Sequence, residues 1–462
     1  MISRPAAYQD GLPPGARSRS VLVILLGIAV SVIDVTIFNL ALPGIARDLH
    51  ASAADAVWVV NAYQLAALAF LLPFAAVGER IGYRTVYLGG MLTLARGVQG
   101  LGAAGIMAVN GALLRLTYSS RMPGRGIAIN PAVVATASVA GPSLAALVLA
   151  YASWPWLFAP NVPLGLLVLL LGWRALPHNR ISIANGTRLS WLDVALNAAM
   201  LGLFFLGAQA LSERAGTASA AGTPGLALGL LGSGLVVGVV YVRRQWILRA
   251  PLFPIDLLRL PVFGLSMCTS VASFTAQTLA YVALPFLLLE AGGYSPVEAG
   301  LLITAWPVAV VATAPVAGRL IGRYADGLLG AVGLAIMAGG LALLAALPAA
   351  PTFAAIAWRL AVCGLGFGLF QSPNNHTILT SAPAPRMSAA GGMLGTARLT
   401  GQTLGAVILV FIFNVASVHD GHGPLLALVL AAGFAAEASV FSLLRLRHAS
   451  AQAVASPPAN PA

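Results

Sequence analysis

One repeated feature leaves this chain few choices of fold: apolar stretches of about 20 residues, separated by short segments that carry most of the arginines. As a helix, such a stretch matches the hydrocarbon thickness of a bilayer, and a helix satisfies its backbone hydrogen bonds where water is absent. We therefore expect an all-α, polytopic helical membrane protein with about 13 spans. The candidate spans are residues 20–42, 56–77, 85–114, 126–150, 155–173, 191–211, 224–242, 262–289, 298–317, 328–349, 352–378, 389–415 and 424–443.

Composition excludes the other broad classes of protein. Of the 462 residues, 59% are hydrophobic and 8% are charged, whereas a soluble domain carries about 25% charged residues. The net charge is +12, and every basic residue is an arginine, but no basic face with interleaved aromatic residues points to nucleic acid. The expected partner is the lipid bilayer. Cys268 and Cys363 lie in apolar stretches, which argues against a disulfide framework.

The sequence carries no motif of catalysis or of cofactor binding. It has no phosphate-binding P-loop, no HExxH zinc motif and no GxSxG nucleophile elbow. His419 and His422 have no further metal ligands nearby, so a solvated loop explains them better than a metal site. We expect a protein that is not an enzyme, binds no cofactor or metal, and is not driven directly by ATP.

The arginines predict the orientation of the spans. With a cytoplasmic N-terminus and two crossings within 85–114, 20 of the 25 arginines fall on the cytoplasmic side, Arg445 among them. Two, Arg47 and Arg214, fall outside, and the other three lie within spans. This asymmetry is a strong topology signal.

The segment 85–114 conflicts with that count. Its 30 residues make about 45 Å of helix, which is enough for one crossing of about 30 Å and not for two. A single crossing would invert everything downstream. The other option is a half-extended or re-entrant segment over 86–95, buried in protein or lining a wet cavity.

The spans divide the chain into five regions. We expect a cytoplasmic tail over 1–19, an N-terminal helical bundle over 20–190 with a truncated third span, and two additional spans over 191–242. A C-terminal helical bundle follows over 243–448, and 449–462 is expected to be disordered. A weak repeat relates the two bundles, because the Arg96-Gly-Val-Gln run resembles the one that begins at Arg359.

Asp34 is the first candidate for chemistry, because it lies in the middle of the first span. A carboxylate at that depth costs about 2.5 to 3.5 kcal/mol on insertion scales, so it must face the bundle interior, be paired, or be protonated part of the time. A carboxyl group that moves between such environments is a proton switch. A structural hydrogen bond to a neighbouring helix is the alternative.

Three arginines within spans are the second group of candidates. Arg96 cannot lose its proton, so it needs a partner such as Asp34, Asn61, Gln64 or Gln99. It could tune the protonation of Asp34, or it could reach water at a membrane surface. Arg359 and Arg398 carry the same two interpretations, and for Arg359 the membrane surface is favoured.

Small and polar side chains within the spans are the third group. Gly141 and Pro142 are either a hinge or ordinary close helix packing. Polar and aromatic side chains are candidates for a substrate cavity, although lipid contact or core packing should explain more than half of the aromatic ones. The cavity candidates are Phe38, Asn39, Asn61, Tyr63, Gln64, Gln99, Phe274, Gln277, Tyr281, Phe370, Gln371 and Asn374.

Together these motifs resemble the drug:proton antiporters with fourteen spans in the major facilitator superfamily. The resemblance covers about 20–445. It is carried by Asp34-Val-Thr-Ile-Phe-Asn39-Leu-Ala-Leu-Pro43, Trp58-Val-Val-Asn61-Ala-Tyr63, Gly78-Glu79-Arg80-Ile-Gly82-Tyr-Arg84, Arg96-Gly-Val-Gln99-Gly100, Ala140-Gly141-Pro142 and Phe370-Gln371-Ser-Pro373-Asn374.

The resemblance implies two pseudo-symmetric six-helix bundles with two extra central helices, in the inner (cytoplasmic) membrane. It implies a monomer in which inward proton flow drives export of small hydrophobic or cationic drugs. Asp34 would be the protonation site and Arg96 its modulator. Glu79, Arg80, Gly82 and Arg84 would gate the cytoplasmic side, together with Gly141 and Pro142.

Two departures from the family pattern leave other functions open. Most of the third span is missing, since only 11 residues separate Arg84 from Arg96, and Pro160 interrupts a stretch that usually lacks proline. A non-transporting, deletion-damaged relative is therefore one alternative. An exporter of a natural product or a siderophore is the other.

Overall fold

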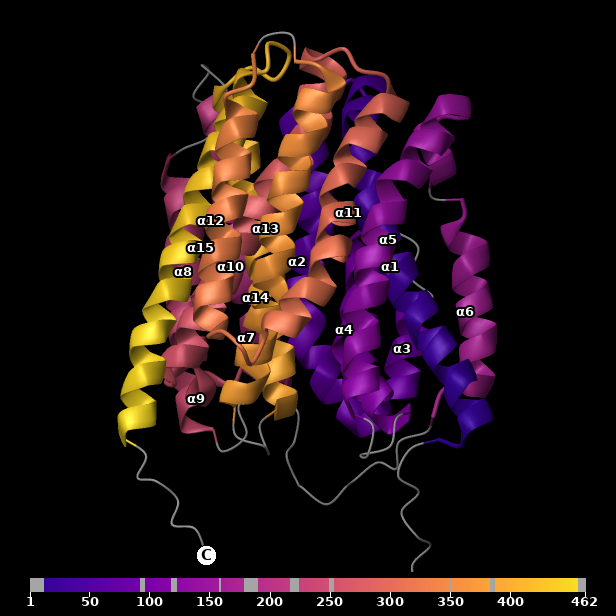
Figure 1. The fold of residues 1–462 in the computed structure, drawn as a ribbon, viewed down its shortest axis with the longest axis vertical. Helices are drawn as coiled ribbons and strands as arrows, with labels where there is room; N and C mark the ends of the chain where they lie inside the picture. Colours follow the sequence, from indigo (N-terminus) through magenta and orange to yellow (C-terminus); the bar gives the residue numbers. More distant parts are fainter. Residues whose placement is uncertain are drawn as a thin grey trace, which may run out of the picture.

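The computed structural model describes residues 12–91, 96–117, 123–157, 159–177, 190–216, 224–248, 253–348, 351–382 and 387–455. Within these ranges the regular structure is helical, and the helices form a long bundle (Figure 1). Both ends of the described chain lie at one end of the bundle, the lower end in Figure 1, where α1 begins and α15 ends. The elements are α1 Pro14–Asp48, α2 Ala53–Ile81, α3 Tyr83–Met91, α4 Arg96–Thr117, α5 Pro123–Tyr151, η1 Trp154–Leu157, α6 Asn161–Ala175, α7 Trp191–Gly216, α8 Pro224–Ile247, α9 Ile255–Leu258, α10 Pro261–Phe286, the π-helical turn η3 Leu287–Ala291, α11 Pro296–Leu320, α12 Asp326–Ala345, α13 Phe353–Ser381, α14 Met387–Val415 and α15 His422–Ala455.

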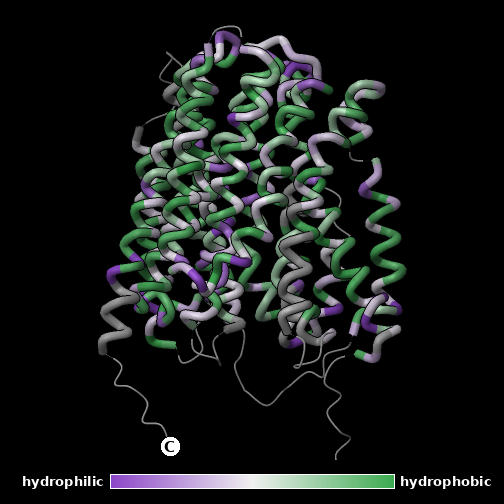
Figure 2. Tube along the Cα trace, viewed as in Figure 1, coloured by the Kyte–Doolittle hydropathy of each residue, from purple (hydrophilic) through white to green (hydrophobic). Residues whose placement is uncertain are grey.

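The helices have the length and the apolar surface of membrane spans. Within the described ranges, 11 of them are long and apolar enough to cross a bilayer. The described apolar parts of α4 and α5 are shorter, and with them the helices account for the 13 expected spans. The helices are hydrophobic along most of their length (Figure 2), and many large apolar side chains, such as Leu170, Trp173 and Val236, are exposed on the bundle. The expectation of an all-α, multi-pass membrane protein is confirmed.

Two equivalent helices begin with the same local motif. Ser52 caps α2 with its hydroxyl group, while the Asp55 carboxylate accepts from the Ser52 backbone N–H; Ser295 and Glu298 repeat this reciprocal arrangement at α11. Such a capping box satisfies N–H groups that the first turn of a helix leaves free. We name α1–α6 the N-half and α10–α15 the C-half. The two capping boxes start the second helix of each half, as an internal repeat requires.

The helices α7 and α8 form a hairpin beside the two halves. Arg244 on α8 pairs with Asp193 on α7, with 2.6 Å between Nε and Oδ1. The Asn197 amide on α7 donates to the Ala69 carbonyl on α2 at 2.8 Å. Much of this hairpin faces outward: 17% of the α7 apolar segment is buried, against 78% for α10. The hairpin is therefore peripheral, whereas α10 lies in the core.

The segment 85–114 folds as a short helix followed by a long one. The 9 residues of α3 rise about 13 Å, whereas the 22 residues of α4 rise about 33 Å. They pack antiparallel, with Gly90 against Gly102 and Gly105 against Val86. Thr117 ends α4 beside the start of α1, because its carbonyl accepts from the Leu12 backbone N–H at 3.1 Å. The helices α3 and α4 together thus return the chain to the lower end of the bundle. The next helix, α5, therefore starts at the same end as it would after two full crossings.

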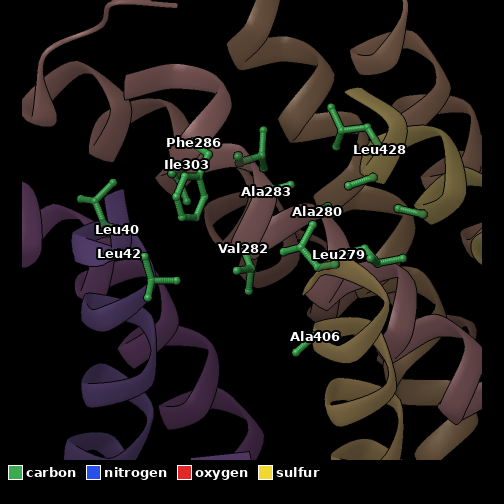
Figure 3. Packing of buried hydrophobic residues seen from close by; sticks show 14 of the residues in the cluster. Leu40, Leu42, Leu279, Ala280, Val282, Ala283, Phe286, Ile303, Ala406 and Leu428 are labelled. Atoms are coloured by element: carbon green, nitrogen blue, oxygen red, sulfur yellow. The ribbon is translucent and has the colours of Figure 1, made fainter. Parts of the chain in front are cut away.

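The two halves share one hydrophobic core at the upper end of the bundle. A single cluster of buried side chains runs from Leu40 and Leu42 on α1 to Phe286 on α10 and Ile303 on α11, as Figure 3 shows. Toward the lower end two buried clusters belong to one half each, and a smaller one joins Leu68 and Leu71 of α2 to Leu399 of α14. Of the first two, one surrounds Tyr87 in the N-half, and the other surrounds Phe263 in the C-half. The halves are therefore joined most extensively at the upper end.

Charged side chains close the rim of that upper core. Glu290 in η3 is largely buried and lies between Arg47 at the end of α1 and His419 in the α14–α15 loop, with N–O distances of 3.8 Å to each. These groups line a cavity of about 570 Å³ at the upper surface. The Arg47–Glu290 pair links the N-half to the C-half.

The C-terminal region differs from a solvated cytoplasmic segment in two respects. Arg445 is 2% exposed and donates to Ser266, Asn374 and Ser442. The helix α15 also continues to Ala455, beyond the boundary at 448, so 449–455 is helical. Residues 456–462 lie outside the described residues. Because α15 is long, Arg445 lies inside the C-half. There hydroxyl and amide oxygens accept the hydrogen bonds that water would accept at the surface.

We expect Gly364→Ala to destabilise the protein, because a Cβ at Gly364 on α13 would overlap the Trp306 carbonyl on α11. Overpacking of this kind costs about 1 to 3 kcal/mol. Gly339→Ala on α12 is the matched control, because a Cβ there meets nothing within 4 Å and alanine is the better helix former. Thermal unfolding of the purified proteins should show a lower midpoint for Gly364→Ala only. Equal midpoints would contradict the close α11–α13 contact.

We expect Glu290→Gln to open the upper end more often, because it removes the ionic attraction between the halves. An exposed ion pair contributes up to about 1 kcal/mol, so opening should increase at most about fivefold. The measurement is the labelling rate of Ala46→Cys, a buried residue beside this rim, with Cys268 and Cys363 replaced. Asp420→Asn is the control, because the Asp420 carboxylate contacts His422 in its own loop. Equal rates in both variants would show that the pair does not hold the halves together.

Candidate functional site

Asp34 lies in the middle of α1, and its side chain is buried within the protein. The residue is 5% exposed. The Asn161 side-chain amide donates to Asp34 Oδ1 at 2.5 Å. This carboxyl group thus faces neither lipid nor a membrane surface, which satisfies the first requirement for a proton-coupling residue.

Asn161 was not among the sequence candidates, although a signal for it exists. It is the first residue of α6, and it follows Pro160, which the sequence analysis identified as an interruption of an apolar stretch. The chain leaves η1, turns at Ala159 and Pro160, and begins α6 beside the middle of α1. A polar amide directly after a helix break in an apolar stretch is the signal that could have pointed to it.

Gly141 and Pro142 lie where α5 meets α1 and the C-half. A Cβ at Gly141 would overlap the Thr36 hydroxyl group, two residues from Asp34. The neighbouring Ser143 hydroxyl lies 3.0 Å from that of Thr304 on α11. The structure therefore gives these small residues a packing role at a three-helix junction; a hinge role stays a prediction.

The residues expected to gate the cytoplasmic side lie at the junction of α2 and α3, from the last turn of α2 to the first turn of α3. Gly82 has φ of 101°, a conformation that glycine adopts without strain and that permits the tight turn into α3. Arg84 on α3 contacts the end of α6: its guanidinium group donates to the Trp173 carbonyl and lies 5.6 Å from the Trp173 ring centroid. Arg80 is exposed. The side chain of Glu79 lies outside the described residues.

Arg96 and Gln99 are placed by their backbone only. Both lie in the first turn of α4, at the end of the helix opposite Thr117. Their side chains are outside the described residues. The proposed modulation of Asp34 by Arg96 therefore stays a prediction.

The cavity candidates of the N-half gather on α1 and α2. Phe38, Asn39 and Tyr63 line a small cavity between these helices, with a volume of about 10 Å³. Asn61 and Gln64 are buried on α2, and the Asn39 and Gln64 carbonyl oxygens and both polar atoms of Asn61 make no hydrogen bond to described residues. Buried amides without a partner are rare. The polar atoms of this region can therefore form hydrogen bonds with water or a ligand.

The aromatic candidates of the C-half form two groups. Phe274, Phe367 and Phe370 make successive edge-to-face contacts with centroid distances of 5.6 and 5.8 Å. Tyr281 packs against Trp306 at 5.0 Å. Gln277 and Gln371 are half-buried on α10 and α13.

Asn374 belongs to a buried polar network around Arg445. Its amide nitrogen donates to the Ser270 hydroxyl at 2.7 Å, and its carbonyl oxygen accepts from Arg445 at 2.8 Å. The sequence analysis did not connect Asn374 with Arg445. The network gives the terminal N–H groups of a buried guanidinium neutral acceptors inside the C-half, while its Nε–H makes no hydrogen bond to a described residue.

Sequence comparison identifies relatives over nearly the whole chain. A profile of the Major Facilitator Superfamily matches residues 24–98 and 89–406. The uncharacterized transporter YebQ of Escherichia coli is 47% identical, with 94% of this chain and 97% of YebQ covered. The riboflavin transporter RibZ of Clostridioides difficile is 27% identical, over 85% of this chain and 87% of RibZ. The multidrug efflux pump LfrA of Mycolicibacterium smegmatis is also 27% identical, over 85% and 80%.

Solved structures of transporters share the fold of this chain. The peptide transporter PepTSo superposes with a TM-score of 0.64 at 15% sequence identity, over 94% of this chain and 99% of that one. At this identity the match concerns the fold. Taken with the profile match and the buried carboxylate of the first span, it establishes that this protein is a multi-pass membrane transporter that belongs to the Major Facilitator Superfamily.

Proposed function

We propose that the protein is a proton-coupled secondary transporter that exports small hydrophobic compounds, drugs among them, across the cytoplasmic membrane. The observation that carries this proposal is the buried Asp34 carboxyl group in α1, bonded to the Asn161 amide of α6. Similarity to the multidrug efflux pump LfrA supports the direction of transport. A transporter of this kind needs a titratable group that is shielded from lipid and that a conformational change can expose to either side.

Asp34 and Asn161 can couple protonation to helix packing. The ionised carboxylate accepts a hydrogen bond from the Asn161 amide, and this bond holds the start of α6 against the middle of α1. A protonated carboxyl group is a weaker acceptor and gains an O–H donor of its own. Protonation therefore changes the bond that joins two helices of the N-half.

The arrangement of the buried clusters supports alternating access. The halves share an extensive core at the upper end, whereas toward the lower end two clusters belong to one half each and a smaller one joins α2 to α14. With the lower end on the cytoplasmic side, as the arginines predict, this unequal packing supports an inward-facing state. In that state Asp34 would release its proton inward, and substrate would enter between the halves.

A natural compound is a second candidate substrate. Similarity to the riboflavin transporter RibZ favours it, because RibZ matches this chain about as well as the drug pump LfrA does. Asp34 would act in the same way for either class of cargo. Efflux by the wild-type protein would also exclude a deletion-damaged, non-transporting relative with a short α3.

We expect Asp34→Asn to abolish proton-driven efflux of the neutral dye Nile red from energised cells, because an amide cannot gain and lose the coupling proton. Asp48→Asn is the matched control: it removes the same charge from the end of α1, where the carboxylate accepts from the Trp154 indole at 3.0 Å. Asp48→Asn should keep at least half of the wild-type rate, and both variants should reach the membrane. Wild-type efflux by Asp34→Asn would refute the proton-coupling role.

A further inference from the structure

Arg398 lies where the two halves of the protein meet. It is on α14 in the C-half, and its guanidinium carbon is 5.6 Å from the ring centroid of Phe274 on α10. Tyr63 on α2 of the N-half is close enough to interact with it electrostatically. Leu399, the next residue of α14, packs in one cluster with Leu68 and Leu71 of α2. The charge of Arg398 is thus presented at the boundary between the halves.

Arg398 has no anionic partner among the residues that the structure describes. Arg47 pairs with Glu290, and Arg244 pairs with Asp193. The Arg398 Nε–H is buried and makes no hydrogen bond to a described residue. A guanidinium group cannot release its proton, and a buried cation is costly without a counter-charge or acceptors.

The Nε–H groups of Arg359 and Arg445 are also unbonded within the described residues, but the inward-placed arginines other than Arg398 donate hydrogen bonds through their terminal N–H groups within one half, whereas Arg398 makes none to a described residue. Arg445 donates to three side chains of the C-half. Arg84 donates to the Trp173 carbonyl, and Arg359 donates to the Ala355 carbonyl at 2.7 Å. In Arg398 the ring of Phe274 covers one face of the guanidinium group and leaves its N–H edge available.

Neutral polar groups without partners lie on the helices around Arg398. Asn61 and Gln64 share one stripe of α2 with Leu68 and Leu71, because residues three and four apart lie on the same face of a helix. The lower part of this stripe packs against α14. The Gln64 carbonyl oxygen and the Thr403 hydroxyl of α14 are buried without a hydrogen bond to described residues.

Phe274, whose ring lies beside Arg398, is the first of three aromatic side chains that pack together in the buried core of the C-half. Phe274 contacts Phe367, and Phe367 contacts Phe370, each edge to face. A flat ring held between the halves can pack beside Phe274, with an oxyanion on that ring at the guanidinium group and uncharged substituents at the α2 amides. The ligand that these groups fit is therefore an aromatic compound with an acidic group.

We propose that Arg398 binds the carboxylate, or an equivalent oxyanion, of an aromatic substrate held between the two halves. This inference rests on the proposed export function and specifies its substrate class. It reverses the charge that the family resemblance implies, because a cationic compound at this place would be repelled by Arg398, whereas a carboxylate supplies the acceptors that its N–H groups lack.

Equilibrium binding to the purified full chain, without a proton gradient, tests the charge preference. The probes are 2-naphthoate, which is ionised at pH 7, and (2-naphthylmethyl)trimethylammonium, which has the same ring and the opposite charge. Wild type should bind naphthoate at least about tenfold more tightly, as expected for a hydrogen-bonded charge pair. Arg398→Gln should lose this preference, and Arg359→Gln, which removes an arginine near the start of α13, should keep it.

Arg398→Lys is a second variant that tests the inference if Arg398→Gln does not fold. The lysine keeps the charge and loses the planar fork, so naphthoate should bind more weakly than to wild type and still more tightly than the ammonium probe. Equal or tighter binding of the ammonium probe by wild type, no binding of either probe, or wild-type binding of naphthoate by a folded Arg398→Gln protein would each overturn the inference.

Flux through proteoliposomes separates this inference from the proposed function. A pH gradient should drive uptake of 2-naphthoate into inside-out vesicles by wild type. Selective binding of naphthoate without gradient-driven flux would refute proton-coupled export and leave the binding role of Arg398 standing. Gradient-driven flux of the ammonium probe in preference to naphthoate would support export and refute the anionic substrate.

Discussion

The structure depends on one constraint: within the hydrocarbon, a polar group can be satisfied only by another group of the protein. The backbone meets this demand by helix formation, and the few charged side chains meet it through contacts between helices. Asp34 takes its bond from Asn161, and Arg445 takes three from Ser266, Asn374 and Ser442. Each of these bonds joins or braces particular helices, so the position of a charge helps to decide which helices pack together.

The same constraint explains why the contact between the halves can be extensive and still reversible. At the upper end it consists of hydrophobic side chains and small residues. When the halves separate there, these side chains meet water without breaking ion pairs of the core. Gly300 on α11 approaches Pro142 and Ala146 on α5 with no room for a Cβ. The ion pair described between the halves at this end, Glu290 with Arg47, lies at the rim. An interface of this kind can be closed in one state and open in the other without a large electrostatic cost.

Two charges inside the protein then divide the work of transport. Asp34 has its hydrogen-bond partner within the N-half and can change its charge. Arg398 cannot change its charge, and it lies at the boundary between the halves with its Nε–H unbonded within the described residues. A titratable carboxyl group suits coupling to protons, and a permanent cation suits recognition of an anionic cargo. The proposals for proton coupling and for the acidic substrate follow from this difference.

The amino-acid sequence by itself determined the all-helical, membrane-embedded class, the positions of nearly all the spans and the burial of Asp34, because these follow from local apolar length and from the cost of a charge in lipid. Only the tertiary structure decided which partners the charges find. Asn161 is 127 residues from Asp34 along the chain, and Arg445 lies inside the C-half instead of in a loop because α15 is long enough to bring it there. It also decided that α3 and α4 form an unequal hairpin and that Arg398 meets Phe274 and Tyr63. Partners distant along the chain depend on how helices pack, which a local pattern does not encode.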